Sequence, residues 1–321
     1  MFSSTFKNFN INFNALNAEN TVTSGDVLTG HISFELAKPT KISSITMTAT
    51  GKAHVHWSTG GGGGKRRRRS RRHFTAKLEF FNLKSAIVQG NAAVGGDMKL
   101  QPGKHMYPFT CQLPHGDFPS SFTGIHGNIS YSMTVSISRS WHLAKDFETK
   151  LNFVHHYNTN QPDLRAPLSG TNQMTLCCLW CASPPIAMTV TIEKKAFVPG
   201  EIVKITCNFS NESSRTATPK VKLIQKHDYY THNKLNRRMY AKTLVSDTDQ
   251  PIGARTCYVQ TDIMLTIPSS AALTISNCSI LVLSYWIEVS LSVCGSRDLT
   301  VMFPIILCDT PVYTEEPPVY S

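Results

Sequence analysis

The chain has 321 residues, of which 41% are hydrophobic and 17% are charged, and it carries a formal net charge of +11. This length and apolar content are enough for one large or two ordinary domains with buried cores. The net charge does not indicate a nucleic-acid-binding fold, because seven of the positive charges come from the run Lys65–Arg72 and the remainder is near +4 (11 − 7).

No segment reads as a membrane span, and the first residues lack the basic-then-apolar pattern of a signal peptide. Nine cysteines, an odd number without a regular framework, are typical of a reducing compartment. These features predict a cytosolic protein.

Alternation of apolar and polar residues runs through most of the chain and predicts antiparallel sheets with one buried face. It is clearest in residues 129–138, where the odd positions are expected to face a core and the even positions water. Residues 285–293 repeat the pattern in the second half. We therefore predict an all-β protein.

Two landmarks recur with matching spacing in the two halves. A turn glycine precedes a strand phenylalanine by nine positions, and a Leu-Pro or Ile-Pro pair precedes a strand tyrosine by 17 positions. These landmarks are Gly25 with Phe34, Gly200 with Phe209, Pro114 with Tyr131 and Pro268 with Tyr285. This repetition indicates an internal duplication and predicts two similar β-sandwiches.

The composition suggests where these parts begin and end. We expect a first domain over residues 1–160, with a Gly/Arg-rich surface loop at 58–74. An Asn-, Pro- and Ser-rich linker is predicted at 161–184 and a second domain at 185–309. Residues 310–321 hold three prolines and two glutamates and read as a flexible tail.

The chain ends on Pro317-Pro318-Val319-Tyr320-Ser321, which contains a PPxY motif. Consecutive prolines favour a polyproline II helix, so docking into an aromatic groove of the WW type costs little ordering entropy. Pro317, Pro318 and Tyr320 are therefore the candidate WW-binding residues. The alternative is a proline-rich end without a ligand.

The basic run is the second candidate site. Its cations are Lys65, Arg66, Arg67, Arg68, Arg69, Arg71 and Arg72. They could contact anionic lipid or an acidic partner, serve in nuclear import, or form a solvated insertion without a ligand. No aromatic residues are interleaved with them, so sequence-specific nucleic-acid binding is not expected.

Other motifs give weaker indications. Cys178 and Cys181 form a CxxC pair, but a second pair that would complete a zinc site is not evident, so linker or buried thiols are favoured over metal or redox chemistry. His54 and His56 share one strand face and are expected to face solvent. No catalytic motif is recognisable, and we predict a protein that is not an enzyme and has no cofactor.

Several stretches of the chain resemble the arrestin-domain-containing proteins, or α-arrestins, over about residues 2–309. The stretches that carry this resemblance are Ser24–Gly30, Gly51–Trp57, Leu100–Phe109, Phe118–Gly127, the strand ending at Trp141, Phe197–Glu201, Asn211–Ser214 and Phe303–Ile306. The resemblance implies two tandem arrestin-type β-sandwiches.

The resemblance also implies a function. The expected role is a non-enzymatic adaptor that links membrane receptor or transporter cargo to a WW-domain HECT-type ubiquitin ligase, with recruitment to the plasma membrane and endosomes. Relatives often carry more than one PPxY, whereas Pro311-Val312-Tyr313 lacks the second proline. A ligase-independent transport scaffold of the same fold is the alternative, and an extracellular recognition module is a third reading that the odd cysteine count disfavours.

Overall fold

The structure is a computed structural model of the chain. It describes residues 5–14, 17, 19–60, 71–89, 97–178 and 181–313, without the side chains of 176–178 and 181–183. The described chain is almost entirely β-strand, as predicted. Its one helix, α1 (Pro162–Arg165), has four residues, and none of the described segments forms a helix long and apolar enough to cross a membrane.

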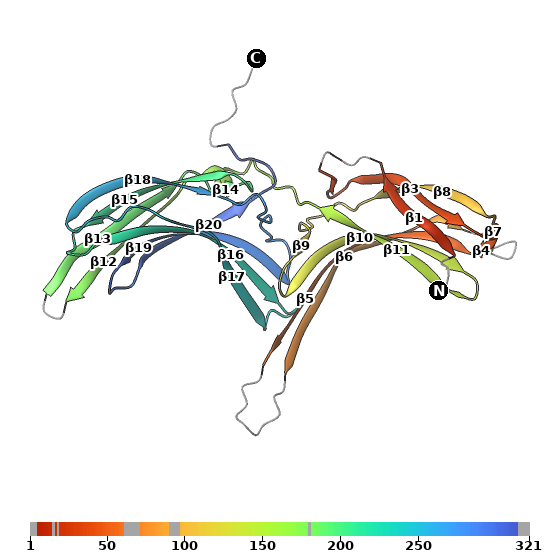
Figure 1. Cartoon of the computed structure of the whole chain (residues 1–321), viewed down its shortest axis with the longest axis horizontal. Coiled ribbons are helices and arrows are strands. Elements are labelled where there is room, and N and C mark those ends of the chain that lie inside the picture. Colours follow the sequence, from red (N-terminus) through yellow and green to blue (C-terminus); the bar gives the residue numbers. More distant parts are fainter. Residues whose placement is uncertain are drawn as a thin grey trace, which may run out of the picture. The chain divides into compact units, whose positions relative to one another are not determined.

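The first compact unit is drawn from residues 1–155, 230–236 and 277–281, and it contains a two-layer β-sandwich (Figure 1). One layer has the strand order β1-β3-β8, and the other has β2-β11-β10-β5-β6, with β9 paired to β10. A short third sheet pairs β4 with β7. The strands are β1 (Phe6–Phe13), β2 (Thr21–Val22), β3 (Val27–Leu36), β4 (Thr40–Ile42), β5 (Ser44–Thr59), β6 (Arg72–Gln89), β7 (Met98–Leu100), β8 (Gly103–Gln112), β9 (Phe122–Thr123), β10 (Gly127–Arg139) and β11 (His142–Phe153).

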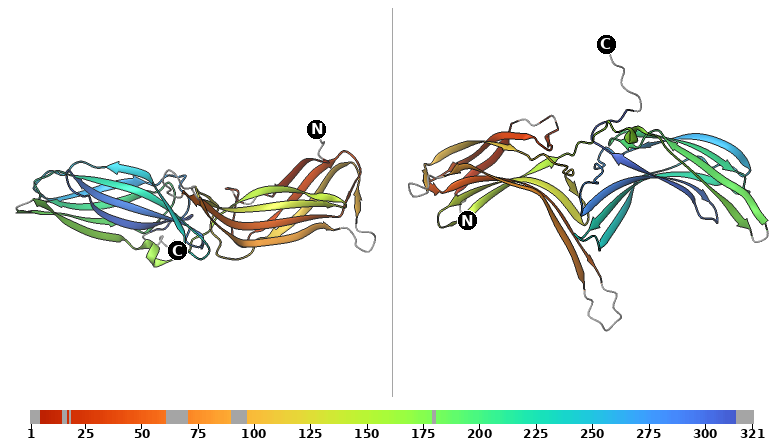
Figure 2. Two further views of the ribbon diagram at one scale, coloured as in Figure 1. Left: turned by 90° about the horizontal axis from the view of Figure 1, so that it is seen from below. Right: turned by 180° about the vertical axis from the view of Figure 1, so that it is seen from behind.

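The second unit, from residues 156–229, 237–276 and 282–321, is also a two-layer sandwich (Figures 1 and 2). Its layers have the orders β12-β13-β15-β18 and β14-β20-β19-β16-β17. The strands are β12 (Leu168–Cys178), β13 (Cys181–Ile192), β14 (Ala196–Phe197), β15 (Ile202–Asn211), β16 (Ala217–Tyr230), β17 (Arg237–Thr248), β18 (Thr256–Thr266), β19 (Leu281–Val293) and β20 (Leu299–Leu307).

Alternating burial confirms the predicted pattern in the central strands. In β10 the side chains at 129, 131, 133, 135 and 137 are buried, and β19 buries every odd position from 281 to 293. Each alternating apolar set faces the opposite sheet of its own sandwich, where burial stabilises the fold. Ser132 and Ser290 are exceptions, since both are buried at positions expected to face water.

The internal duplication is visible in matching hydrogen bonds. The N–H of Leu113 donates to the carbonyl of Asp26 at 2.8 Å, and the N–H of Ile267 donates to that of Glu201 at 2.9 Å. The preceding turn glycines have φ of +82° at Gly25 and +91° at Gly200, a region that favours glycine. The sequence landmarks therefore mark the same turn in both sandwiches.

The two repeated tyrosines are also equivalent. The hydroxyl of Tyr131 donates to the carbonyl of Pro119 at 2.6 Å, and that of Tyr285 donates to the carbonyl of Ala272 at 2.6 Å. Both rings are fully buried, and burial raises the pKa of Tyr285 to about 12. Each buried hydroxyl thus has the partner that its desolvation requires.

The predicted linker at 161–184 is wrong, because most of it is strand. β12 pairs with β13 from Leu168↔Ile192 to Cys178↔Cys181, so it is an edge strand of the second sandwich. Its described side chains are exposed or half-buried, and the half-buried positions include Gly170 and Asn172. Gly170 and Asn172 interrupt the apolar face between Leu168 and Met174, which explains why the sequence resembles a linker.

Candidate functional site

Most residues of the predicted sites lie outside the described part of the chain. This holds for the motif residues Pro317, Pro318 and Tyr320, and for five cations of the basic run, Lys65, Arg66, Arg67, Arg68 and Arg69. Arg71 and Arg72 are described and both are exposed. The structure therefore describes the strands on both sides of the basic run and the chain that precedes the PPxY motif.

The basic run joins the ends of β5 and β6. Pairing of these strands continues to Thr59↔Arg72, so the surface loop is shorter than the predicted 58–74. The rings of Trp57 and Phe74 stack across the two strands with centroids 5.3 Å apart, and Trp57 is 3% exposed. This stacked pair holds the hairpin together where the sequence alone suggested a loop.

The chain before the PPxY motif is attached to the second sandwich by Lys194. The Lys194 ammonium donates to the carbonyl of Val312 at 2.6 Å and to the carboxylate of Glu201 at 2.5 Å. It also lies 5.1 Å from the centroid of the Phe197 ring. Lys194 is only 7% exposed, so these contacts replace the water that a buried ammonium loses.

Apolar packing fixes the same segment. Val312 is buried in a cluster with Leu164, Ala196 and Cys308. The predicted tail over 310–321 therefore starts too early, because residues 310–313 belong to the sandwich surface. Pro311-Val312-Tyr313 is therefore not available as a free peptide ligand, because the Val312 side chain is packed in this cluster.

Asp309 adds a polar attachment next to this cluster. Its carboxylate accepts hydrogen bonds from the backbone N–H of Tyr157 at 3.0 Å, the hydroxyl of Thr310 at 3.0 Å and the His156 ring. Burial opposes ionisation, but these three bonds lower the pKa of Asp309 below its ordinary value. The ionised carboxylate thus stabilises the folded second sandwich.

The lowered pKa of Asp309 makes the free energy of unfolding depend on pH. Because the folded pKa is depressed, the contribution of Asp309 is complete above the ordinary carboxyl pKa of about 4 and is lost as pH falls through the lower folded value. We expect Asp309→Asn to lower the urea midpoint at pH 7. The difference from wild type should shrink below pH 4, and a difference that stays constant from pH 7 to pH 3 would contradict this assignment.

Sequence reasoning did not identify Lys194, Asp309 or Val312 as functional. Their partners lie far away in the chain: Lys194 is 118 positions from Val312, and Asp309 is 152 positions from Tyr157. A weak signal exists in Glu201, which belongs to the Pro-Gly-Glu turn already noted and lies seven positions from Lys194. Only the fold brings these groups together.

His56 is exposed as predicted, whereas His54 on the same strand face is half-buried, and the cysteine prediction stays open. His54 bonds the Thr75 hydroxyl at 3.2 Å, and His56 is exposed. Burial, followed by the nearby charges of Lys77 and His56, lowers the pKa of His54, so it is neutral at pH 7. The side chains of Cys177, Cys178 and Cys181 lie outside the description, and the described residues contain no group of three or more metal-ligating side chains.

Comparison with known proteins agrees with this architecture. The family described as "Arrestin (or S-antigen), N-terminal domain" matches residues 9–160, and "Arrestin (or S-antigen), C-terminal domain" matches residues 182–312. The first match covers most of the first sandwich, and the second covers the second sandwich from β13 onward, without β12.

Individual relatives match across both domains. Arrestin domain-containing protein 4 of Mus musculus is 28% identical over 290 residues, which cover 90% of this chain and 68% of the relative. Thioredoxin-interacting protein of Homo sapiens is 25% identical over 306 residues, covering 94% of this chain and 74% of the relative. With two arrestin domains in order and these relatives, the chain belongs to the α-arrestin family of arrestin domain-containing proteins.

Proposed function

We propose that this protein is a trafficking adaptor that links membrane receptor or transporter cargo to a WW-domain HECT-type ubiquitin ligase. The arrestin fold and the α-arrestin relatives support an adaptor-type role, because arrestin-family proteins generally bind partner proteins and are not enzymes. The observation that carries the finer proposal is the Pro317-Pro318-Val319-Tyr320 motif directly after the second arrestin domain. Ubiquitination of the cargo would then direct it into endocytosis and endosomal sorting.

The attachment of Val312 supports a short tether between motif and body. Pro317 is only five positions after Val312, which allows at most about 18 Å of extended chain. A ligase bound at the motif would therefore stay close to the second sandwich and to any cargo held there. This proximity raises the effective concentration of the ligase at the cargo.

The cargo side would use the sheets themselves. β1, β6, β12, β18 and β17 lie at the ends of their sheets and offer backbone donors and acceptors along one edge. An extended cargo segment could pair with such an edge, since β-augmentation combines main-chain hydrogen bonds with side-chain pockets. We place this encounter in the cytoplasm, with recruitment to the plasma membrane and endosomes.

The basic run is the proposed secondary contact of this adaptor. Its seven cations lie within eight consecutive positions and would attract an anionic lipid surface or an acidic partner. The described strands β5 and β6 pair up to Thr59↔Arg72, so the run begins and ends next to this strand pair in the chain.

The test of ligase recruitment is a calorimetric titration of the full protein with WW domains of a HECT ligase. We expect Tyr320→Ala to weaken binding by about tenfold or more, because the tyrosine fills its own slot beside the proline groove. Tyr313→Ala is the matched control, since Tyr313 is 65% exposed but lacks a proline pair before it. It should bind like the wild type.

Two results would contradict the proposal. Equal affinity of Tyr320→Ala and wild type would place the WW contact elsewhere. Absence of binding by both would favour the ligase-independent transport scaffold. Phosphorylation of Tyr320 adds about two negative charges to an aromatic slot and should act like the alanine substitution.

A further inference from the structure

A hairpin in the first sandwich exposes two large apolar side chains. The turn between β10 and β11, with Leu143 after it, forms what we call the hairpin tip (residues 139–143). Trp141 is 101% exposed and Leu143 is 92% exposed. Trp141 also has φ of +63°, which is uncommon for a residue with a bulky side chain. The local backbone therefore presents an indole to solvent.

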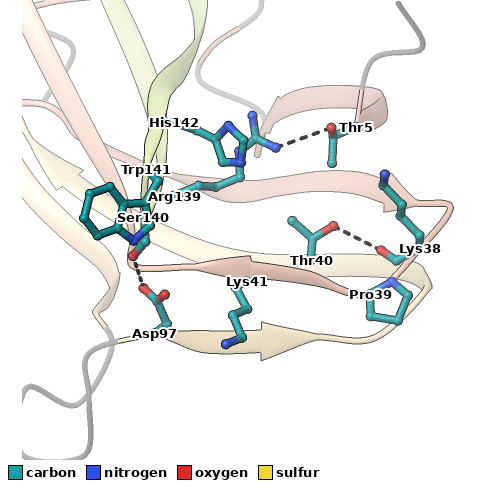
Figure 3. Close-up of a pocket in the computed structure, with 10 residues that line it drawn as sticks. All are labelled: Thr5, Lys38, Pro39, Thr40, Lys41, Asp97, Arg139, Ser140, Trp141 and His142. Atoms are coloured by element: carbon teal, nitrogen blue, oxygen red, sulfur yellow. Dashed lines mark hydrogen bonds between the residues drawn. The ribbon is translucent and has the colours of Figure 1, made fainter.

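A polar hollow lies beside the hairpin tip (Figure 3). It is open to solvent and has a volume of about 670 Å³, and its lining includes three cations and one carboxylate: Lys38, Lys41, Arg139 and Asp97. The single carboxylate already accepts a hydrogen bond from the Ser140 hydroxyl at 2.7 Å. The hollow therefore carries an excess of positive charge suited to an anion.

Cross-strand pairing places a further cation, Lys99, next to the lining residue Lys41. Lys41 of β4 is directly opposite Lys99 of β7, and both side chains are exposed on the same face of this two-stranded sheet. Like charges directly opposite each other are destabilising. Neither lysine forms an ion pair with any residue that the structure describes. A bound anion would relieve the repulsion between them.

Arg139 also has unused hydrogen-bonding capacity. One guanidinium nitrogen donates to the Thr5 hydroxyl over a long 3.4 Å, and the group lies 5.6 Å from the centroid of the Phe6 ring. Its buried Nε has no hydrogen-bond partner among the described residues. Guanidinium groups match phosphate oxygens in geometry, so this residue is well suited to a phosphate ligand.

We propose that the hairpin tip docks on a membrane containing anionic phospholipid. Trp141 and Leu143 would enter the interfacial region, where indole rings are favoured because they combine an apolar body with a polar N–H. Lys38, Lys41 and Arg139 would meet the headgroup phosphates. A soluble anion would use the cations alone and would leave the exposed indole without a role.

This site is separate from the basic run. Ser44 at the start of β5 pairs with Ser138, next to the hairpin tip, whereas Thr59 at the end of β5 leads into the basic run. Fifteen positions separate Ser44 from Thr59, which corresponds to about 50 Å of strand. The two contacts can therefore be tested independently of each other and of the PPxY motif.

The test is flotation of the full protein with phosphatidylcholine vesicles, with and without phosphatidylserine. We expect Trp141→Ala combined with Leu143→Ser to reduce binding to phosphatidylserine vesicles about tenfold. Lys38→Gln and Lys41→Gln, both at exposed positions, should each reduce it about fivefold. The series is repeated with Arg66–Arg69 changed to serine, so that the basic run does not mask the effect.

Matched controls are available elsewhere on the surface. Leu235 is 81% exposed and Arg238 is exposed, so Leu235→Ser and Arg238→Gln remove similar groups at another place and should bind as wild type. Unchanged circular dichroism shows that each variant is folded.

Three outcomes would overturn the proposal: wild-type vesicle binding by the hairpin-tip variants, equal binding to vesicles without phosphatidylserine, or a loss of binding in the controls that equals the loss in the hairpin-tip variants. Glycerophosphoserine supplies the soluble comparison. If this headgroup alone bound as tightly as the vesicles, the site would be an anion site and the membrane contact would be refuted.

Discussion

Replacing Lys194 by methionine is expected to lower the free energy of unfolding of the second sandwich by about 3 kcal/mol. The change keeps the length of the side chain but removes the ammonium that joins Glu201 to the carbonyl of Val312. The Val312 carbonyl would then lose this partner, and the Glu201 carboxylate would keep only the N–H of Val198. Unpaired buried polar groups account for the expected cost.

The consequence should be local as well as global. Hydrogen exchange followed by mass spectrometry should show faster exchange at the amide of Cys308, which donates to the Phe197 carbonyl at 2.9 Å next to this cluster. WW-domain affinity should remain that of the wild type, because the motif lies beyond the attached segment. Lys194→Met therefore separates anchoring of the chain from recognition of the ligase.

Lys195→Met is the matched control for this prediction. Lys195 is the next residue, and its ammonium pairs with Asp163, whose side chain is 73% exposed. A surface ion pair of this kind contributes about 1 kcal/mol or less. Equal destabilisation by the two methionine variants would show that Lys194 is not the anchor of the segment.

Replacing Trp57 by alanine is expected to lower the free energy of unfolding of the first sandwich by about 3 kcal/mol. The buried indole stacks on Phe74 and closes the β5–β6 hairpin next to the basic run. Its removal leaves a cavity that the paired strands cannot fill without moving. Urea unfolding followed by circular dichroism measures the effect.

Trp141→Ala provides the contrast within the same sandwich. This substitution removes the same side chain from a position that is 101% exposed, so it should leave stability unchanged. A large loss of stability in Trp141→Ala, or a negligible loss in Trp57→Ala, would contradict these assignments. An unchanged stability of Trp141→Ala would also show that its effect on vesicle binding does not come from misfolding.

Alternation and turn spacing determined the fold class and the duplication. The strands around Tyr131 and Tyr285 show clear alternation because each is central in its sheet and one face is buried. The repeated glycine and proline landmarks keep their spacing because both sandwiches use the same turn. Local sequence was sufficient here, because strand alternation and turn geometry each depend on only a few neighbouring residues.

The same reasoning failed for β12 and for the segment around Val312. The inner face of β12 includes Gly170 and Asn172 and is only half-buried, so the strand has a polar composition like that of a loop. Val312 is a single apolar residue between polar and proline positions, and its burial depends on Leu164 and Ala196 from other parts of the chain. No local pattern marks such a segment as ordered.

The sequence by itself determined two β-sandwiches, the PPxY motif and the basic run, because these depend on periodicity, turn chemistry and composition. Only the tertiary structure decided that Val312 packs on the second sandwich, which ammonium is buried, and that Lys41 lies opposite Lys99 beside an exposed Trp141. These features arise from contacts between residues distant in sequence. Their energies depend on distance and burial, and only the folded chain sets these quantities.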